Sequence, residues 1–368
     1  MTQPIEQILE SAIAKDASDI HLTVGRPITY RLSGELTSQT DVNLKPEDTE
    51  ALAHEITTEE QRKVVQEVGG LDFGFAFKDK ARFRVSLFKQ QGFLGMVMRM
   101  LPNKFRTFAE IGLPDQIRDT LNRPRGLILV TGPTGSGKTT TLAAMINYIN
   151  DNFAKHIITA EDPIEFLYPM HKSVINQREV GIDVPSFAAA VEKALRQDPD
   201  VILIGEMRGL ETMQNAIRAA ETGHLVFSTL HTTGAARTVD RIIDVFPPEQ
   251  QQQIRVQLSS VIVAVISQAL IPRIDKPGRI AAHDVLIATP AIRNLIREGK
   301  TYQVNSELQT GKKYGMKYLD DVLKQYYADG IISYESALEF AQEPRDLAGQ
   351  LAQITPKKKG DPVVPPKV

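Results

Sequence analysis

Cysteine and tryptophan are both absent from this chain of 368 residues. Without a thiol, the chain can form no disulfide, no cysteine nucleophile, no thiolate zinc site and no iron–sulfur cluster. A large excess of one charge is also missing, because 43 lysines and arginines stand against 45 aspartates and glutamates. This near balance disfavours a generally basic nucleic-acid-binding protein and leaves open only a local basic patch.

The sequence also has no long hydrophobic run. The first fifteen residues mix acids and amides with apolar residues, so they do not resemble a signal peptide. The strongest apolar stretch, Val261–Ile266, is far shorter than the ~20 residues that span a bilayer. Its length predicts a buried core helix. We therefore expect a cytoplasmic protein, which can still dock on a membrane complex.

The length predicts two domains, since one hydrophobic core rarely serves so many residues. Residues 1–102 have the pattern of a small α+β domain. In the segment 81–88, arginines alternate with apolar residues, which places Arg82 and Arg84 on one face of a strand. Arg99 lies among apolar neighbours in a further strand. The expected elements are a helix at Ile5–Ala14 and strands at Ile28–Leu36, Phe73–Lys78, Ala81–Phe88 and Gly92–Leu101.

The hydrophobic pattern of the sequence changes after a proline-rich stretch, and we place a linker at residues 103–120. From Gly126 onwards, short continuous apolar runs alternate with helical segments, which is typical of parallel strands covered on both faces. Residues 121–355 are therefore predicted to form an α/β domain whose later part is mainly helical. The proline- and lysine-rich end, residues 356–368, is predicted to be disordered.

One segment of the second domain matches the phosphate-binding pattern G-x-x-x-x-G-K-[ST], between a predicted strand and a predicted helix. Its glycines let backbone N–H groups converge on phosphate oxygens, and the helix N-terminus adds positive charge. Lys138 is expected to reach the β- and γ-phosphates, and the hydroxyl of Thr139 to bind Mg²⁺. The predicted nucleotide-binding residues are Gly132, Pro133, Thr134, Gly135, Ser136, Gly137, Lys138, Thr139 and Thr140.

Acidic residues follow two other predicted strands. Glu206 comes after an apolar strand, where it can support Mg²⁺ beside the phosphate loop. The alternative is a carboxylate that merely caps the next helix. Glu161, Asp162 and Glu165 follow the strand before it, and a nearby cation or a polarised water would account for such a cluster. An acidic solvated loop is the alternative, and the residues leave open which acid is the general base.

Two histidines stand at opposite ends of one predicted strand. His224 begins this strand and His231 follows it. As a neutral hydrogen-bond donor, either side chain can sense a γ-phosphate, although a lone histidine is more often structural.

These four segments, in this order, resemble the motor ATPases of secretion systems and type IV pili. The segments that match the Walker A, Asp, Walker B and His boxes of that superfamily are GPTGSGKT, ITAEDPIEF, DPDVILIGEMRG and TGHLVFSTLHT. The segment Ala291–Lys300, AIRNLIREGK, resembles the signature of the pilus retraction ATPases, the PilT family. We predict that this helix transmits motion or contacts a partner, or else belongs to the core.

The resemblance implies a homo-hexameric ring in which each chain has a PAS-like N-terminal domain and a RecA-like domain, with ATP between subunits. Arg84 and Arg99 match the arginines that reach a neighbouring site, although they can also be solvent-facing strand residues. Glu165 would be the base for the attacking water. The resemblance also implies that Glu161 and Asp162 position the water and that Glu206 supports Mg²⁺. His224 and His231 would lie near the γ-phosphate.

The implied function is Mg²⁺-dependent ATP hydrolysis that drives pilus disassembly and twitching motility, with the ring docked at the inner-membrane platform protein at the pilus base. Assembly ATPases of the superfamily often carry a four-cysteine zinc motif and a longer N-terminal extension, and neither is visible here. An assembly or type II secretion ATPase is the main alternative. A non-hydrolysing nucleotide-binding subunit and a RecA-like nucleic-acid translocase are less favoured, and we expect neither nucleic acid nor zinc as a partner.

Overall fold

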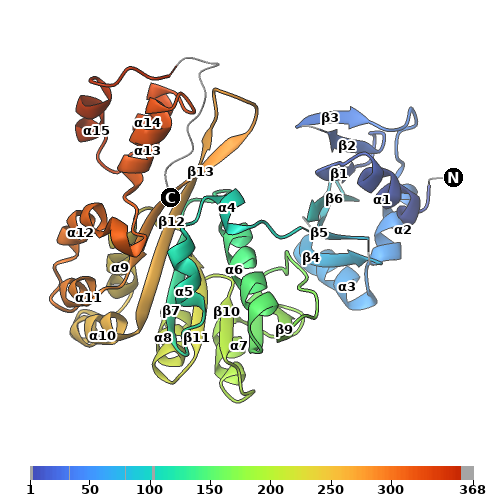
Figure 1. The fold of residues 1–368 in the computed structure, drawn as a ribbon. Coiled ribbons are helices and arrows are strands. Elements are labelled where there is room, and N and C mark those ends of the chain that lie inside the picture. The colour runs from blue at the N-terminus through green and yellow to red at the C-terminus, as the bar shows by residue number, and fades with distance from the viewer. Residues whose placement is uncertain (1–2, 33, 79, 102–103, 358–368) are drawn as a thin grey trace. The chain divides into compact units, whose positions relative to one another are not determined.

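The computed structural model describes residues 3–32, 34–78, 80–101 and 104–357. The chain divides into two compact units, one formed by Met1–Lys104 with Pro163–Leu167, the other by Phe105–Asp162 with Tyr168–Val368. Figure 1 labels their elements. Most of the tail predicted to be disordered, residues 358–368, lies outside the described residues.

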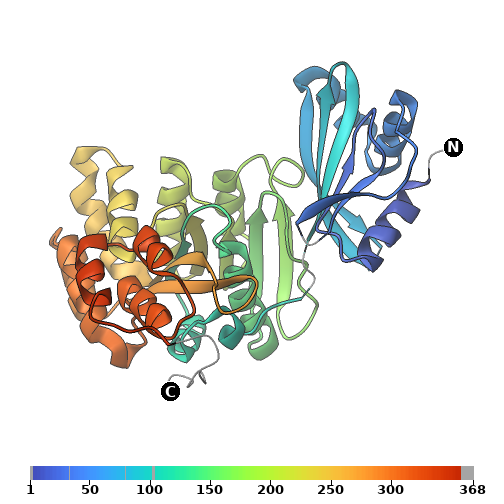
Figure 2. The ribbon, with the colours of Figure 1, turned by 90° about the horizontal axis from the view of Figure 1, so that it is seen from above.

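The first unit is a six-stranded antiparallel sheet with the strand order β3-β2-β1-β6-β5-β4. Helices α1 (Ile5–Ala14), α2 (Pro46–Ile56) and α3 (Glu59–Val68) contribute to its single hydrophobic core, and Figure 2 gives a second view of them. The strands are β1 (Asp19–Leu22), β2 (Thr29–Leu32), β3 (Glu35–Ser38), β4 (Gly70–Phe77), β5 (Ala81–Gln90) and β6 (Phe93–Leu101).

The predicted alternation in β5 is confirmed. Phe83, Val85 and Leu87 are buried in the core, whereas Arg82 and Arg84 lie on the other face of the strand. The single strand expected at Ile28–Leu36 is instead the hairpin of β2 and β3, in which Leu32 pairs with Glu35.

The second unit is built on a seven-stranded sheet with the order β13-β12-β7-β11-β10-β8-β9. Neighbouring strands from β12 to β9 are parallel, and β13 pairs antiparallel with β12. The strands are β7 (Gly126–Thr131), β8 (His156–Glu161), β9 (Val174–Glu179), β10 (Val201–Ile204), β11 (Leu225–Leu230), β12 (Ile262–Pro272) and β13 (Arg279–Ile287).

Helices cover both faces of this sheet, as the continuous apolar runs predict. Alternate residues of β7 pack into two hydrophobic cores, one on each face of the sheet. Leu127 and Leu129 belong to the first cluster, and Ile128 and Val130 to the second. The second of these clusters includes α6 (Lys138–Asn152), and the first includes α7 (Phe187–Ala194), α8 (Leu210–Glu221), α9 (Ala235–Asp244) and α10 (Pro248–Val261).

The core helix predicted at Val261–Ile266 is wrong. Helix α10 ends at Val261, and the strand β12 begins at the next residue. β12 lies between β7 and β13 and is buried on both faces, so its apolar run shows no alternation. A short run of this kind has the same pattern in a helix and in a strand, and the β-branched residues in it favour the strand.

The linker expected at residues 103–120 also differs from the structure. Residues 102–103 lie outside the described part, and most of the remainder packs into the second unit. Thr107 caps a short helix by accepting a hydrogen bond from the backbone N–H of Glu110. The elements here are α4 (Phe108–Ile111), the 3₁₀ turn η1 (Asp115–Ile117) and α5 (Arg118–Leu121), and their buried side chains are Phe108, Ile111, Leu113, Ile117 and Leu121.

The C-terminal part of the second unit is helical. Its elements are α11 (Pro290–Arg297), η2 (Thr301–Gln303), α12 (Val304–Thr310), η3 (Gly311–Tyr314), α13 (Leu319–Ala328), α14 (Tyr334–Phe340) and α15 (Pro344–Leu351). Helix α11 carries the AIRNLIREGK segment. Ile292 and Ile296 are fully buried, and the guanidinium of Arg293 donates to the backbone oxygens of Ser259 (2.7 Å) and Ser260 (2.6 Å). For Ile292 and Ile296 the core interpretation of the segment holds.

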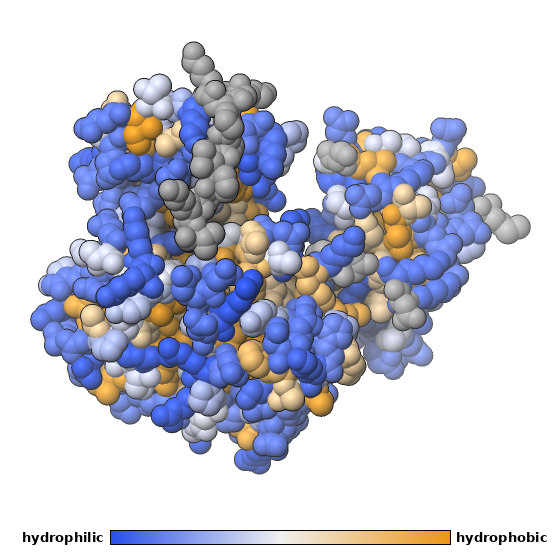
Figure 3. Space-filling model, in the orientation of Figure 1, coloured by the Kyte–Doolittle hydropathy of each residue, from blue (hydrophilic) through white to orange (hydrophobic). Residues whose placement is uncertain are grey.

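Hydrophilic residues predominate on the face drawn in Figure 3, with apolar residues scattered among them. Within the described ranges, every helix is too short or too polar for a membrane span.

Asp284 on β13 is a fully buried carboxylate that joins two parts of the second unit. Its Oδ2 accepts a hydrogen bond from the backbone N–H of Ala235 (2.8 Å), and its Oδ1 from that of Leu319 (3.2 Å). It therefore ties the start of α9 to the start of α13. Burial outweighs these hydrogen bonds and raises the pKa of Asp284 to about 6.

This raised pKa predicts a pH dependence of stability. The protonated form of Asp284 is favoured in the folded chain, so its contribution is present below about pH 4 and is lost as the pH rises through about 6. The unfolding free energy of the wild type minus that of Asp284→Asn should therefore fall by about 2 kcal/mol between pH 4 and pH 7. Chemical unfolding of both chains across this range measures the difference, and a constant value would contradict the prediction.

Candidate active site

Each of the four motif segments contains or follows one of four neighbouring strands of the second sheet. β7, β11, β10 and β8 are parallel and adjacent, and their register pairs Thr131 with Leu230 and Ile204 with both Ser228 and Ala160. Because the strands end at the same edge, the segments that follow them start side by side. The phosphate loop, His231, Glu206 and the acidic pair Glu161 and Asp162 therefore begin along one edge.

The phosphate loop between β7 and α6 has the backbone that its glycines allow. Gly132, Gly135 and Gly137 have φ angles of 139°, 77° and 88°. Helix α6 begins directly after Gly137, and the first N–H groups of a helix have no partners within it. Lys138 Nζ donates to the backbone oxygens of Gly132 (2.9 Å) and Pro133 (3.2 Å). The loop thus presents a helix N-terminus and an ammonium group, the combination that binds phosphate.

Gln268 on β12 contacts this loop and was missed by sequence reasoning. Its side chain is buried and donates to the backbone oxygen of Ser136. A methyl group on Gly132 would lie 2.2 Å from the backbone oxygen of Gln268, so only glycine fits at this position. The available signal was a polar pair, Ser267 and Gln268, inside an otherwise apolar run.

Glu206 and His231 are in contact at this edge. Glu206 Oε1 accepts from His231 Nε2 (3.2 Å) and from Arg208 Nε (2.8 Å). Burial raises the pKa of Glu206, but the hydrogen bond and charge of Arg208, together with His231, outweigh it and lower that pKa. Glu206 is therefore a carboxylate at neutral pH. Arg208 was also missed, although it lies within the quoted Walker B segment.

His224 does not share this edge. It precedes β11, its backbone oxygen accepts from Gly126 N at the start of β7, and its ring Nδ1 contacts Ala219 O (2.9 Å). Six residues of β11 separate it from His231, which corresponds to roughly 20 Å of strand. Within one chain, β11 therefore separates His224 from the edge that carries the phosphate loop, and its expected place near a γ-phosphate stays a prediction.

The three acids of the Asp box fall into different surroundings. Glu161 is buried, and its Oε1 accepts from Thr159 Oγ1 (2.7 Å) and Gln177 Nε2 (3.1 Å). Asp162 is exposed at the end of β8. Glu165 is half-buried and belongs to the segment 163–167 of the first unit.

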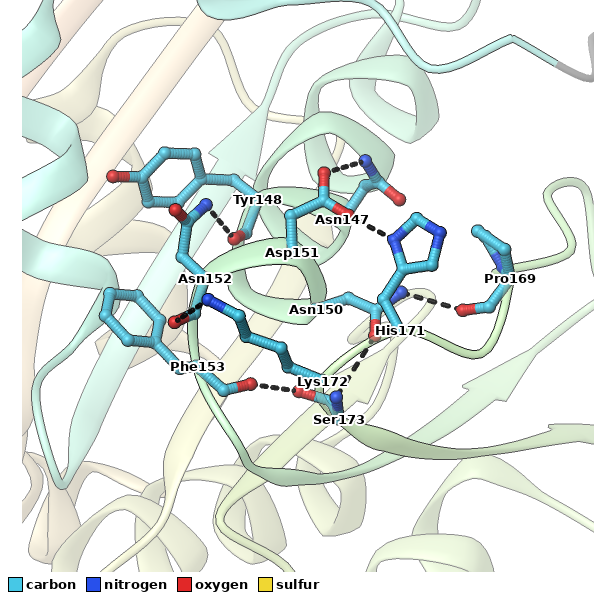
Figure 4. Close-up of polar contacts among 10 residues, drawn as sticks. All are labelled: Asn147, Tyr148, Asn150, Asp151, Asn152, Phe153, Pro169, His171, Lys172 and Ser173. Carbon is cyan, nitrogen blue, oxygen red and sulfur yellow. Dashed lines mark hydrogen bonds and ion pairs between the residues drawn. The ribbon is translucent and has the colours of Figure 1, made fainter.

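The segment that leads from the Asp box to β9 is tied to the far end of α6. Asn150 is fully buried, donating to the backbone oxygen of Pro169 (2.8 Å) and accepting from Ser173 N (3.3 Å). Figure 4 shows these bonds beside the contact of His171 with Asp151. Helix α6, which begins at the phosphate loop, therefore also fixes the segment that connects the Asp box to β9.

Arg84 and Arg99 are direct cross-strand neighbours in the first unit. The same row continues from Arg99 to Asp19 on β1 and from Asp19 to Arg31 on β2. Asp19 accepts from Arg99 Nε (2.9 Å) and lies 3.5 Å from Arg31 Nε. Burial raises the pKa of Asp19, but these arginines and Ser18 outweigh it and lower that pKa. Two arginines thus contact the Asp19 carboxylate, whereas Arg84 lies 4.0 Å from the carboxylate of Asp72. Two-thirds of the Arg99 side chain is exposed.

Comparisons with known proteins agree with this architecture. Residues 1–314 match the family described as Type II/IV secretion system protein. The chain is 48% identical over 346 residues to the type IV pilus retraction ATPase PilT of Pseudomonas aeruginosa, covering 93% of this chain and 99% of that one. It is 49% identical over 310 residues to a twitching motility protein of Neisseria gonorrhoeae, covering 83% of each.

A crystal structure of the pilus retraction motor PilT with bound ADP resembles this chain with a TM-score of 0.88 and 47% identity, over 94% of this chain and 99% of that one. This likeness confirms the expected fold class, an N-terminal α+β domain followed by a P-loop α/β domain with a helical C-terminal part.

The close approach of β12 to Gly132 makes a testable prediction. Gly132→Ala places a methyl group against a backbone oxygen, whereas the corresponding position at Gly135 has no atom within 4 Å. Overpacking and strain at Gly132 should cost about 3 kcal/mol, against about 1 kcal/mol at Gly135 for the left-handed backbone alone. We expect the melting temperature to fall by about 10 °C for Gly132→Ala and about 3 °C for Gly135→Ala, and equal shifts would contradict this account.

Proposed function

Because this chain belongs to the Type II/IV secretion system protein family, we propose that it is an ATPase whose hydrolysis cycle drives retraction of a type IV pilus. The proposal rests on the similarity of both units to retraction ATPases. In one such relative, the match covers 99% of its length. The chemistry is that of a P-loop enzyme, since a phosphate loop, an ionised glutamate and a histidine begin along one sheet edge.

Nucleotide binding falls to the phosphate loop. The N-terminus of α6 and the loop amides hold the β- and γ-phosphates, and Lys138 exchanges the backbone oxygens of Gly132 and Pro133 for phosphate oxygens. The residues fit Mg²⁺, because the Thr139 hydroxyl and the Glu206 carboxylate are hard oxygen donors. When bound, the ion neutralises charge that develops on the β- and γ-phosphate oxygens.

In the hydrolytic step, a water oxygen attacks the γ-phosphorus, the bond to the β–γ bridging oxygen breaks, and a carboxylate takes the proton of the water. We assign this carboxylate to Glu165. This assignment follows the match of Glu165 to the Asp box, with Asp162 as the alternative base. Glu161 accepts hydrogen bonds from Thr159 and Gln177, and Glu206 from Arg208 and His231, which suits both to positioning. We assign to His231, which contacts Glu206, the role of responding to the γ-phosphate.

We further propose that the working form is a homo-hexamer in which Arg84 and Arg99 complete the site of a neighbouring chain. Their adjacent positions on a rigid antiparallel pair support this role, because two guanidinium groups are presented together. Such arginines stabilise the negative charge that spreads over the transferring phosphoryl group. The proposed partners are the inner-membrane platform protein and the pilus machinery, reached from the cytoplasm.

Substitutions in the phosphate loop and the Glu206 pair test the enzymatic assignment. Lys138→Ala should lose nucleotide affinity and turnover together, since its ammonium group contacts the phosphates. Glu206→Gln should retain ADP binding and lose turnover by about 10²-fold or more, since it keeps the shape and removes the charge. Phosphate release and fluorescent ADP binding measure the two effects, with Glu192→Gln, an exposed acid on α7, as the matched control.

The same Glu206→Gln allele separates retraction from assembly when it replaces the chromosomal gene. Cells that accumulate surface pili and stop twitching support retraction. Cells without pili would instead assign the chain to assembly, and normal turnover by both purified variants would overturn the active-site assignment.

A mixing experiment tests whether the arginines act between chains. Arg84→Ala and Lys138→Ala should each be inactive alone, but an equal mixture should form rings in which about a quarter of the interfaces combine an intact Lys138 with an intact Arg84. Steady-state turnover should then recover towards that fraction of the wild-type rate. Arg26→Ala, an exposed arginine of the same unit, is the control and should be fully active alone. No recovery in the mixture would place Arg84 outside the neighbouring site.

A further inference from the structure

Ser267 and Gln268 form a polar pair in the middle of β12, an otherwise apolar strand. Both are buried, with 4% of their surface exposed. A buried amide or hydroxyl destabilises a fold unless it is hydrogen-bonded, so the partners of this pair are informative. The register of β12 with β7 pairs Ser267 with Thr131, the residue directly before the phosphate loop. The next residue of β12, Gln268, therefore lies beside the first residue of the phosphate loop.

Gln268 contacts the phosphate loop at both ends. Its Nε2 donates to the backbone oxygen of Ser136, and its Oε1 accepts from Thr141 Oγ1 (2.7 Å) in the first turn of α6. Its backbone oxygen lies against Gly132 at the other end of the loop. One residue thus sets the separation between the start of the loop and the helix that follows it.

Ser267 contacts the loop that follows β11. Its Oγ accepts from the backbone N–H of Gly234, three residues after His231. Successive residues of a strand point to opposite faces, so the pair reaches two loops that flank the site. β12 itself contributes no group to the four motif segments.

We propose that Gln268 is a positioning residue that keeps the phosphate loop open when Lys138 turns towards a nucleotide. In this structure the ammonium group of Lys138 bonds the loop's own oxygens at Gly132 and Pro133. Binding of phosphate removes those bonds, and the contacts of Gln268 with Ser136 and Thr141 then hold the loop in its receptive shape. Affinity for the diphosphate thereby depends on a residue that does not touch it, through preorganisation.

The inference rests on the proposed nucleotide binding and is tested with the full chain and a fluorescent ADP analogue. Gln268→Leu removes both side-chain hydrogen bonds at nearly constant volume and should weaken ADP binding about tenfold. Thr141→Val removes one of them and should weaken binding less. The double variant should bind no more weakly than Gln268→Leu, because Thr141 acts through Gln268.

A matched control separates this role from ordinary stability. Ile266→Val alters a fully buried residue on the same strand without a polar contact, so it should lower the melting temperature and leave ADP affinity unchanged. Ser267→Ala should also leave ADP affinity unchanged but lower kcat, because its contact is with the loop after His231.

Two outcomes overturn different parts of the argument. Gln268→Leu with wild-type ADP affinity, or with a loss no greater than that of Ile266→Val, would overturn the positioning role. Failure of the wild-type chain to bind ADP would contradict the proposed function itself.

Discussion

The parallel hydrogen-bonded register of β7, β11, β10 and β8 is the constraint on which the site depends. Parallel strands of this kind require helical crossovers, and their carboxyl ends coincide at one edge. The chain can then place a phosphate loop, a histidine and acids beside one another although more than sixty residues separate some of them along the sequence. The apolar residues buried on both faces of these strands maintain the register, so the positions of the polar groups follow from the packing of the core.

Strands β12 and β13 extend this sheet beyond the strands that carry the motifs. Three of the buried polar side chains that they bring connect distant segments: Gln268 at the phosphate loop, Ser267 at the loop after β11, and Asp284 between α9 and α13. Each bonds backbone groups of segments that are distant in sequence. A buried polar group stabilises one arrangement only, because any other leaves it unpaired. The two added strands therefore fix the relative positions of loops that the apolar core alone would leave free to shift.

Local patterns predicted much of this arrangement, and contacts between distant residues were not accessible to them. The phosphate loop was predictable because its function lies in consecutive residues, and the alternation in β5 because a strand has a period of two. The helix predicted at Val261–Ile266 was wrong because an element buried on both faces shows no periodicity that distinguishes a helix from a strand. The position of His224 before its strand was visible in the sequence, but resemblance to a motif does not say which edge of the sheet a residue reaches. Gln268 escaped because its partner Ser136 is 132 residues away.

The charges of the two units bear on the proposed role of Arg84 and Arg99. Arg208 is bonded to Glu206, so its positive charge is already balanced at the sheet edge. In the first unit, Arg31, Arg84 and Arg99 occupy one row with Asp19, and the carboxylates of Asp19 and Asp72 offset only part of their charge. Asp19 also holds the guanidinium of Arg99 in place, which reduces the entropy lost when that group meets an anion. A row of this composition is suited to a highly charged phosphate group, and its orientation is set by the strand pairing before any ligand arrives.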